Sequence, residues 1–166
     1  MATLQRLPVS SERRTERRAP SNHRPTDQKP AITVAAPYPL LDEGEYLAEC
    51  TKASYEWANR YRKWKARLVL SPQDYTGKAY TGQLCRFFNL GTNPDSPRVG
   101  PGSDFRALLV EVHGGQPANS VLDVNIFAGR RYRIAVVTVK QNRKGEPIAA
   151  ANWYSIVRDI HLAEFG

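Results

Sequence analysis

Apolar and polar side chains alternate along several short segments after residue 38, and a two-residue period is typical of half-buried β-strands. Residues 44–55, 60–70 and 83–90 are the first three expected strands, and residues 130–140 and 150–160 are the last two. Ser71 and Pro72 are expected to end the second strand because proline lacks the N–H that a ladder needs. The loop at 141–147 contains Gly145 and no apolar residue until its end, which favours a hairpin between the last two strands.

One segment has the helical period instead. Ser103 and Asp104 are suitable N-cap residues, and the chain after Val112 reaches His113-Gly114-Gly115, a stop signal. Between them, four apolar side chains recur at the spacing i, i+3, i+4 and i+7, namely Phe105, Leu108, Leu109 and Val112. A short helix with one buried face is therefore expected here, and residues 120–127 fit either a second short helix or an extended segment.

The expected order is three strands, a helix and two strands, in a mainly β domain with one or two short helices. This is the chain order of a five-stranded OB-like barrel. The alternative is an open, strongly bent antiparallel sheet with the helix across one face. The alternation alone does not separate these two architectures.

The sides of two strands differ in chemistry. In the second strand Trp64, Ala66, Leu68 and Leu70 share the side that suits a core. In the last strand Tyr154, Ile156 and Ile160 form the more apolar side, and Trp153 belongs to the less apolar one.

Composition divides the chain in two. All aromatic residues lie at or after Tyr38, and residues 1–37 hold seven basic and three acidic residues together with five prolines. We therefore predict a disordered basic Pro/Arg-rich tail at 1–37 and the folded domain at 38–166. The tail is either a solubilising leader or a mobile polycation that extends a nucleic-acid footprint.

The charge and the cysteines restrict the function classes. The formal net charge of +8 and the pI near 9.7 favour a polyanionic partner. The only cysteines, Cys50 and Cys85, belong to no metal-binding spacing, so we expect neither a metal nor another cofactor. No apolar run is long enough for a transmembrane helix and no secretory signal precedes the charges, so we expect a cytoplasmic protein, nucleoid-associated if it binds DNA.

The remaining side of the second strand is the main candidate for nucleic-acid binding. Residues two apart on a strand are about 6.6 Å apart, close to the phosphate repeat of an extended single strand. Tyr61, Lys63, Lys65 and Arg67 have this spacing, and Arg131 and Arg133 form a second short ladder. The loops at 55–60 and 141–145 and the last strand contribute Trp57, Arg60, Arg143, Lys144 and Trp153. The alternative is an ordinary solvated strand face, with both tryptophans as half-buried packing residues.

Residues 40–160 also resemble a family. The segments that carry the resemblance are LLDEGEYLAEC, KWKARLVL, GKAYTGQLCRFFNLG, FAGRRYRIAVVTV and NWYSIVRDI. They look like small phage and mobile-element proteins of the single-stranded-DNA-binding type, whose motifs contain no catalytic core. The resemblance implies an OB-like barrel that acts without catalysis in replication or recombination of a virus or integrated element.

Two other functions stay open. One is a protein-interaction module for a replication or recombination partner. The other is a metal-dependent nuclease that uses Glu45, Glu49 and a distant carboxylate such as Asp123. Nucleotide hydrolysis through a P-loop is excluded because no GxxxxGK[ST] motif occurs. The sequence does not predict an oligomeric state or a preference between DNA and RNA.

Overall fold

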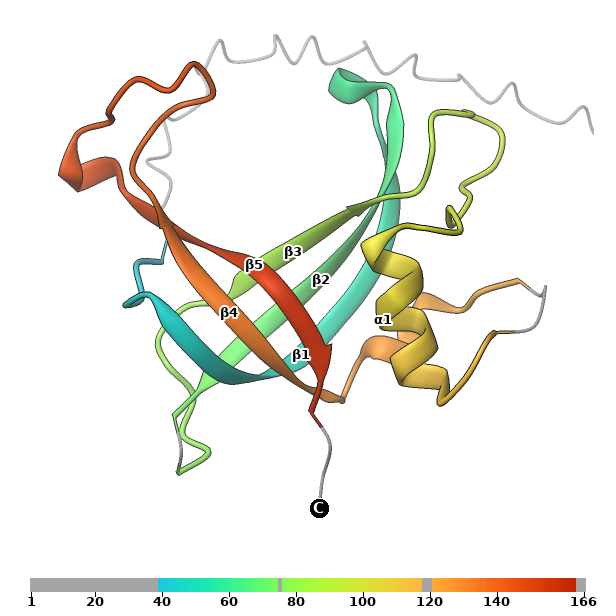
Figure 1. Ribbon diagram of the computed structural model, residues 1–166, viewed down its shortest axis with the longest axis horizontal. Helices are drawn as coiled ribbons and strands as arrows, with labels where there is room; N and C mark the ends of the chain where they lie inside the picture. The colour runs from blue at the N-terminus through green and yellow to red at the C-terminus, as the bar shows by residue number, and fades with distance from the viewer. Residues whose placement is uncertain (1–38, 75, 118–120, 164–166) are drawn as a thin grey trace, which may run out of the picture. The chain divides into compact units, whose positions relative to one another are not determined.

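The computed structural model describes residues 39–74, 76–117 and 121–163, so the predicted tail at 1–37 lies outside the described residues. The described chain forms one five-stranded antiparallel sheet and one α-helix (Figure 1), which confirms the mainly β prediction. The strands are β1 (Gly44–Ala58), β2 (Lys63–Gln73), β3 (Leu84–Asn89), β4 (Arg131–Val139) and β5 (Tyr154–Leu162). The helices are α1 (Asp104–His113) and the short 3-10 segments η1 (Asn59–Tyr61), η2 (Val124–Phe127) and η3 (Ala150–Asn152).

The predicted second strand has the wrong bounds at both ends. It starts at Lys63 rather than at residue 60, because η1 and the left-handed Arg62, with a φ of 48°, make the turn from β1. It also continues past Ser71 and Pro72, since Pro72 pairs with Ala48 of β1. Proline has no N–H to donate, but this position uses only its carbonyl, which accepts the N–H of Tyr80 at 2.8 Å.

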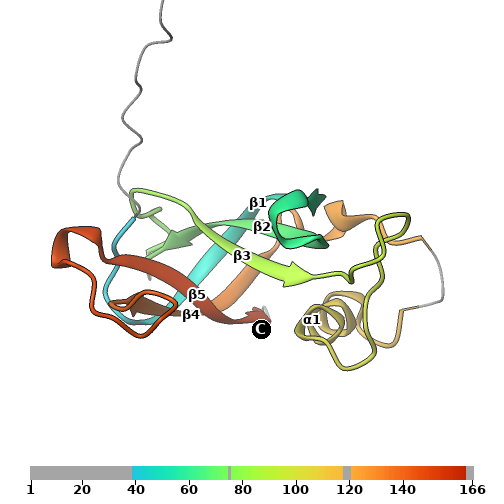
Figure 2. The ribbon, with the colours of Figure 1, turned by 90° about the horizontal axis from the view of Figure 1, so that it is seen from above.

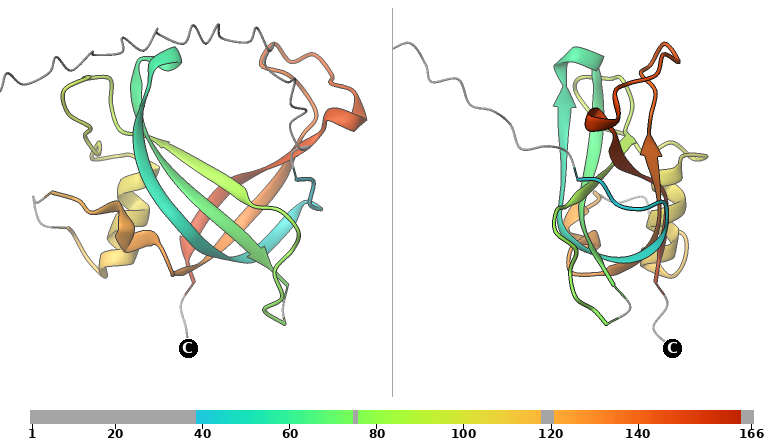
Figure 3. Two further views of the ribbon diagram at one scale, coloured as in Figure 1. Left: turned by 180° about the vertical axis from the view of Figure 1, so that it is seen from behind. Right: turned by 90° about the vertical axis from the view of Figure 1, so that its left-hand side faces the viewer.

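Strand β1 joins two halves of the sheet. Its residues 47–58 pair with β2, while residues 44–49 pair with β4 on its other side. The register shifts between Cys50 and Lys52, so Thr51 is the extra residue of a β-bulge, and bulges bend and twist the strand that contains them. The right-hand view of Figure 3 shows the resulting curvature. β1 passes along the bend between one wall of the sheet, formed by β2 and β3, and the other, formed by β4 and β5.

The sheet is bent but not closed. Its hydrogen-bonded order is β3-β2-β1-β4-β5, and no ladder within the described residues joins the edge strands β3 and β5. Of the two predicted architectures, the strongly bent antiparallel sheet is therefore the observed one. β3 and β5 nonetheless lie close together, as Figure 2 shows from above, and a side chain spans them.

That side chain is Arg86 of β3. Its Nη1 donates to the Val157 carbonyl of β5 at 3.1 Å, and its Nη2 donates to Asp104 Oδ2 of α1 at 3.2 Å. Its buried Nε has no partner among the described residues. Arg86 thus links the two sheet edges and the helix at the place where a closed barrel would have a strand ladder.

The helix forms as the sequence predicts. Ser103 is the N-cap, its Oγ accepting the N–H of Arg106 at 3.3 Å, and Gly114 in the left-handed region ends the helix. The four predicted apolar residues are all buried. The Phe105 ring lies 5.1 Å from that of Phe88 and 5.2 Å from that of Phe127, so α1, β3 and η2 share one aromatic core.

Two buried polar side chains of this core are in their neutral forms. The Tyr132 hydroxyl donates to the Phe127 carbonyl at 3.0 Å, and burial raises the pKa of its phenol. Burial also raises the pKa of the Cys50 thiol to about 11. Cys50 is thus a neutral core thiol, while Cys85 is half-buried on β3.

The predicted faces of the last strand are wrong in its first half. Ser155 and Val157 are buried, whereas Ile156 is 39% exposed. A β-bulge is the reason. Val136 pairs with Val157 but Ala135 pairs with Asp159, so Arg158 is an extra residue in β5. The extra residue reverses the alternation of buried and exposed side chains between Val157 and Ile160. Ser155 tolerates burial because its Oγ donates to the Leu41 carbonyl at 3.1 Å and accepts the Leu41 N–H at 2.8 Å.

We predict that Arg86→Ala lowers the free energy of unfolding by about 2 kcal/mol, because it removes the donor to Val157 and leaves a cavity. Asp104→Asn should cost no more than about 0.5 kcal/mol, since an ion pair with an exposed carboxylate contributes little. Urea unfolding of the two variants measures this. Equal destabilisation by the two substitutions would show that Arg86 does not hold the sheet edges together.

Candidate nucleic-acid interface

The β1–β2 hairpin and the β4–β5 loop extend from the sheet toward the same side of the described domain, at the top of Figure 1. The 3-10 turn η1 forms the tip of the hairpin. The loop is shaped by Asn142, whose Oδ1 accepts the N–H groups of Lys144 at 2.9 Å and Glu146 at 3.0 Å, and by Gly145 with a φ of 81°. These local bonds hold Arg143 and Lys144 at the loop tip.

Arg143 connects the two loops. Its Nη2 donates to the Tyr61 hydroxyl at 3.0 Å, a contact between residues 82 positions apart in the sequence. The sequence pattern assigns both residues to the interface but does not predict that they touch. The contact is exposed, so its partners are accessible to a ligand.

Four cations gather around the Tyr61 ring. Lys65 Nζ lies 3.9 Å from the ring centroid, and the charged groups of Arg143, Arg60 and Lys63 lie at 5.5, 5.8 and 5.9 Å. These distances are within the range of cation–π attraction. The hydrogen bond from Arg143 and then its charge, followed by the charges of Arg60 and Lys65, lower the pKa of the Tyr61 phenol.

Tyr61 itself lies in η1 and not in β2, which corrects its predicted place at the start of the strand ladder. Lys63, Lys65 and Arg67 do alternate along β2 as predicted, on the side opposite the buried Ala66 and Leu68. The aromatic ring therefore reaches the lysines through the folding of the hairpin tip rather than through strand periodicity.

Phe87 is a member of the site that the sequence-based prediction omits. It is 49% exposed, it pairs with Arg67 across β2 and β3, and Lys65 Nζ lies 5.6 Å from its ring centroid. The signal is present in the sequence, because Leu84, Arg86 and Phe88 face inward and so Phe87 must face outward. We call the group that these contacts and pairings join the basic–aromatic face: Arg60, Tyr61, Lys63, Lys65, Arg67, Phe87 and Arg143.

The two predicted tryptophans lie in packing contacts. The rings of Trp57 and Trp64 meet edge to face with their centroids 5.8 Å apart, and both residues are half-buried. Trp153 is also half-buried, its Nε1 donating to the Ile148 carbonyl at 3.1 Å, while Lys140 Nζ lies 5.1 Å from its ring centroid. Neither has a contact with Tyr61 among the described residues, so the packing interpretation describes them better.

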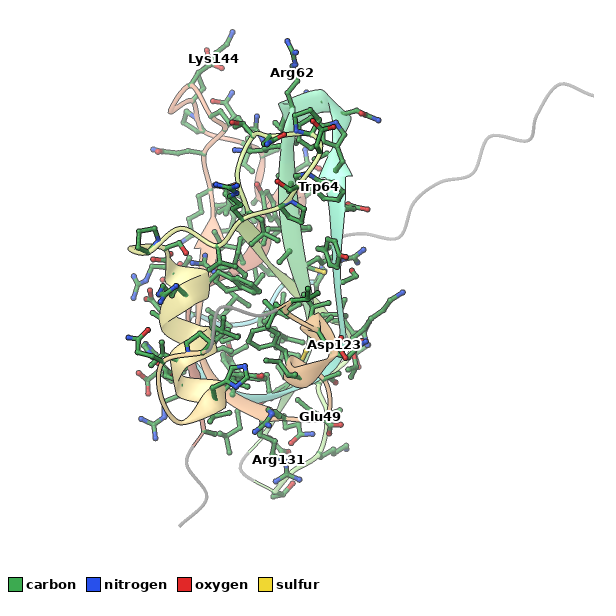
Figure 4. All side chains as sticks on the ribbon, turned by 90° about the vertical axis from the view of Figure 1, so that its right-hand side faces the viewer. Glu49, Arg62, Trp64, Asp123, Arg131 and Lys144 are labelled. Atoms are coloured by element: carbon green, nitrogen blue, oxygen red, sulfur yellow. The ribbon has the colours of Figure 1, made fainter. Side chains whose placement is uncertain are left out.

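The second predicted ladder lies elsewhere. Figure 4 shows Arg131 at the end of the molecule opposite Arg62 and Lys144. Arg133 pairs with His161 across β4 and β5, in the neighbourhood of Glu111, whose Oε1 lies 3.0 Å from His161 Nδ1. Arg131 and Arg133 therefore do not extend the basic–aromatic face.

Two cations flank that face at the tips of the loops. Lys144 is among the predicted residues, whereas the position of Arg62 in the sequence does not single it out. Both are exposed, and Figure 4 shows them projecting from the same end of the molecule. The left-handed backbone at Arg62 turns its side chain out of the β2 alternation, which strand periodicity could not indicate.

The carboxylates of the nuclease hypothesis are not assembled. Within residues 39–74, 76–117 and 121–163, no group of three or more His, Cys, Asp and Glu side chains could hold a metal ion. Glu45 and Glu49 lie on β1, and Asp123 caps η2 by accepting the N–H of Asn125 at 2.9 Å.

A scan against protein-family models finds no match to this chain, and a search of curated proteins finds no similar sequence. Among the described residues, no helix has the length and apolar character to cross a membrane.

The Arg143–Tyr61 contact predicts a measurable titration. The Tyr61 phenol should ionise at lower pH than Tyr46 and Tyr132, whose pKa values are raised by burial, and Arg143→Gln should raise the pKa of Tyr61 toward its usual value. NMR of isotope-labelled tyrosine, with Tyr61→Phe to assign the resonance, measures this. An unchanged Tyr61 pKa in Arg143→Gln would contradict the contact.

Proposed function

We propose that this protein binds single-stranded DNA without catalysis, through phosphate charge and base stacking and with little sequence preference. The observation that carries the proposal is the Tyr61 ring, which lies among cations from the hairpin, from β2 and from the β4–β5 loop. Single-strand binding requires this combination, because cations neutralise phosphates while an exposed ring stacks with a base.

The electrostatics of the face support the same function. Lys63, Lys65, Arg67 and Arg143 make none of the ion pairs found among the described residues, so their charges are not neutralised by a protein carboxylate. Glu56 lies opposite Lys65 in the β1–β2 ladder, but it is exposed and makes no ion pair with Lys65 among the described residues. The cations are thus available to a phosphate backbone, whose counterions are released on binding.

The topology supports an OB-like assignment. The helix lies between β3 and β4 in the chain, and β1 is the central strand that pairs with both β2 and β4. In OB-folds the loops between the first two and the last two strands bind oligonucleotides beside strands two and three. Tyr61, Arg143 and Phe87 come from the corresponding hairpin, loop and strand, which supports the OB-like part of the proposal. The proposed role in replication or recombination of a phage or mobile element rests on the sequence resemblance.

The charge contribution can be tested with two equivalent lysine reversals. Lys65→Glu should weaken binding of a labelled single-stranded oligonucleotide about tenfold or more and flatten the log-log salt slope by roughly 0.7 for each phosphate that is no longer neutralised. Lys78→Glu is the control, since Lys78 is exposed in the connection that follows the other end of β2. Fluorescence anisotropy at several salt concentrations gives both quantities, and equal effects of the two reversals would contradict the site.

The stacking contribution predicts a different pattern. Tyr61→Ala should weaken oligonucleotide binding by roughly tenfold, whereas Tyr61→Phe should retain most of the affinity because stacking needs the ring and not the hydroxyl. Equal weakening by the two substitutions would mean that Tyr61 acts through its bond to Arg143. Parallel measurements with single-stranded RNA determine whether the 2′-hydroxyl matters.

A further inference from the structure

A cavity of about 670 Å³ lies on the side of the sheet that α1 covers. It is bounded by α1, by the chain segments before and after α1, and by Tyr55 of β1. Its volume falls within the roughly 300–1,000 Å³ of ligand pockets. Tyr55 lies on the same side of β1 as the buried Ala53, so the cavity and the basic–aromatic face are on opposite sides of the sheet.

The walls of the cavity are mainly aliphatic. Leu90, Val99, Leu109, Val124 and Ile126 line it, and Tyr55 is the only Phe, Tyr or Trp among the described lining residues. Tyr55 is 48% exposed and Val121 is fully exposed, so apolar surface is left uncovered here. Aliphatic concave walls fit aliphatic or aromatic side chains, whereas base stacking needs flat aromatic faces.

The polar groups of the cavity have a positive excess. Arg98, Arg106 and His113 line it together with one carboxylate, Asp123. Within the described residues the exposed Arg98 side chain has no hydrogen bond or ion pair, and the Arg106 side chain bonds only the neutral Gln116, at 3.0 Å. Asp123 is already engaged, because its Oδ1 caps η2.

We propose that this cavity binds an acidic peptide segment of a partner protein, with apolar side chains in the aliphatic cavity and carboxylates on Arg98 and Arg106. The charge complementarity selects an acidic occupant, and the aliphatic lining selects side chains over bases. The site is independent of the basic–aromatic face, so the protein can hold DNA and a partner at the same time.

Short capped peptides test the proposal on the full-length chain. The probe is a pooled set in which Asp or Glu positions alternate with Leu, Ile, Phe or Trp positions. One control pool replaces every acidic residue by Lys, and another replaces every apolar residue by Ala. The acidic apolar pool should shift the NMR signals of Leu109 and Ile126, and the two control pools should not.

Two variants locate the site. Arg98→Glu reverses an exposed charge at little risk to folding and should weaken peptide binding roughly tenfold. Val99→Trp, at a half-buried position of the lining, should block binding by filling the cavity. Lys78→Glu is the control and should change nothing. Arg98→Glu should leave oligonucleotide binding intact, and Lys65→Glu should leave peptide binding intact, so failure of either site is seen separately.

Several results would overturn the proposal. They are an acidic apolar pool that shifts no cavity signal, a Lys pool that binds equally well, or peptide binding that Arg98→Glu does not weaken. Shifts of Leu109 and Ile126 caused by the oligonucleotide instead of the peptides would assign the cavity to nucleic acid and would equally reject a peptide site.

Discussion

The bend of β1 at Thr51 determines where the other strands and their loops lie. One strand pairs with β2 along most of its length and with β4 at its start, so it must turn from one wall of the sheet into the other. At the bend the Cys50 N–H donates to the Arg130 carbonyl at 2.9 Å, and the Gly129 N–H donates to the Cys50 carbonyl at 2.8 Å. These bonds fix where β4 begins, and the position of β4 determines where its loop to β5 emerges.

The contact between Arg143 and Tyr61 follows from that bend. In a flat sheet with this register the two loops would lie at opposite ends of β1, because Gly44 at its start pairs with Val136 near the β4–β5 loop, and Ala58 at its end forms the hairpin with β2. Curvature brings β3 and β5 close enough for Arg86 to span them, and it brings the two loop tips within hydrogen-bond distance. It also divides the surface into a basic–aromatic face and the apolar side that α1 covers.

Local periodicity predicts the parts that local rules determine. The helix with its Ser103 cap, the buried side of β2 and the outward Lys63, Lys65 and Arg67 all follow from spacing in the sequence. The errors arise where one residue changes the register. The bulge at Arg158 reverses the faces of β5, and a two-residue period cannot indicate an inserted residue.

The candidate site shows the same division. Tyr61, Lys65 and Arg143 are identifiable as residues, but their meeting depends on the β4–β5 loop and on the hairpin turn at Arg62. Arg133 has the same two-residue spacing as the β2 cations and lies near Glu111 and His161 instead, because strand position, not residue type, determines which end it reaches. Phe87 could have been found from the inward alternation of its neighbours.

An NMR titration of the labelled protein with a single-stranded oligonucleotide distinguishes the basic–aromatic face from every other surface. We expect shifts of the Tyr61, Lys65, Phe87 and Arg143 signals that saturate together, with little change at Arg133 and His161. Saturable binding that shifts Arg133 and His161 and leaves Tyr61 and Phe87 unchanged, or the absence of any saturable shift at low salt, would contradict binding at this face.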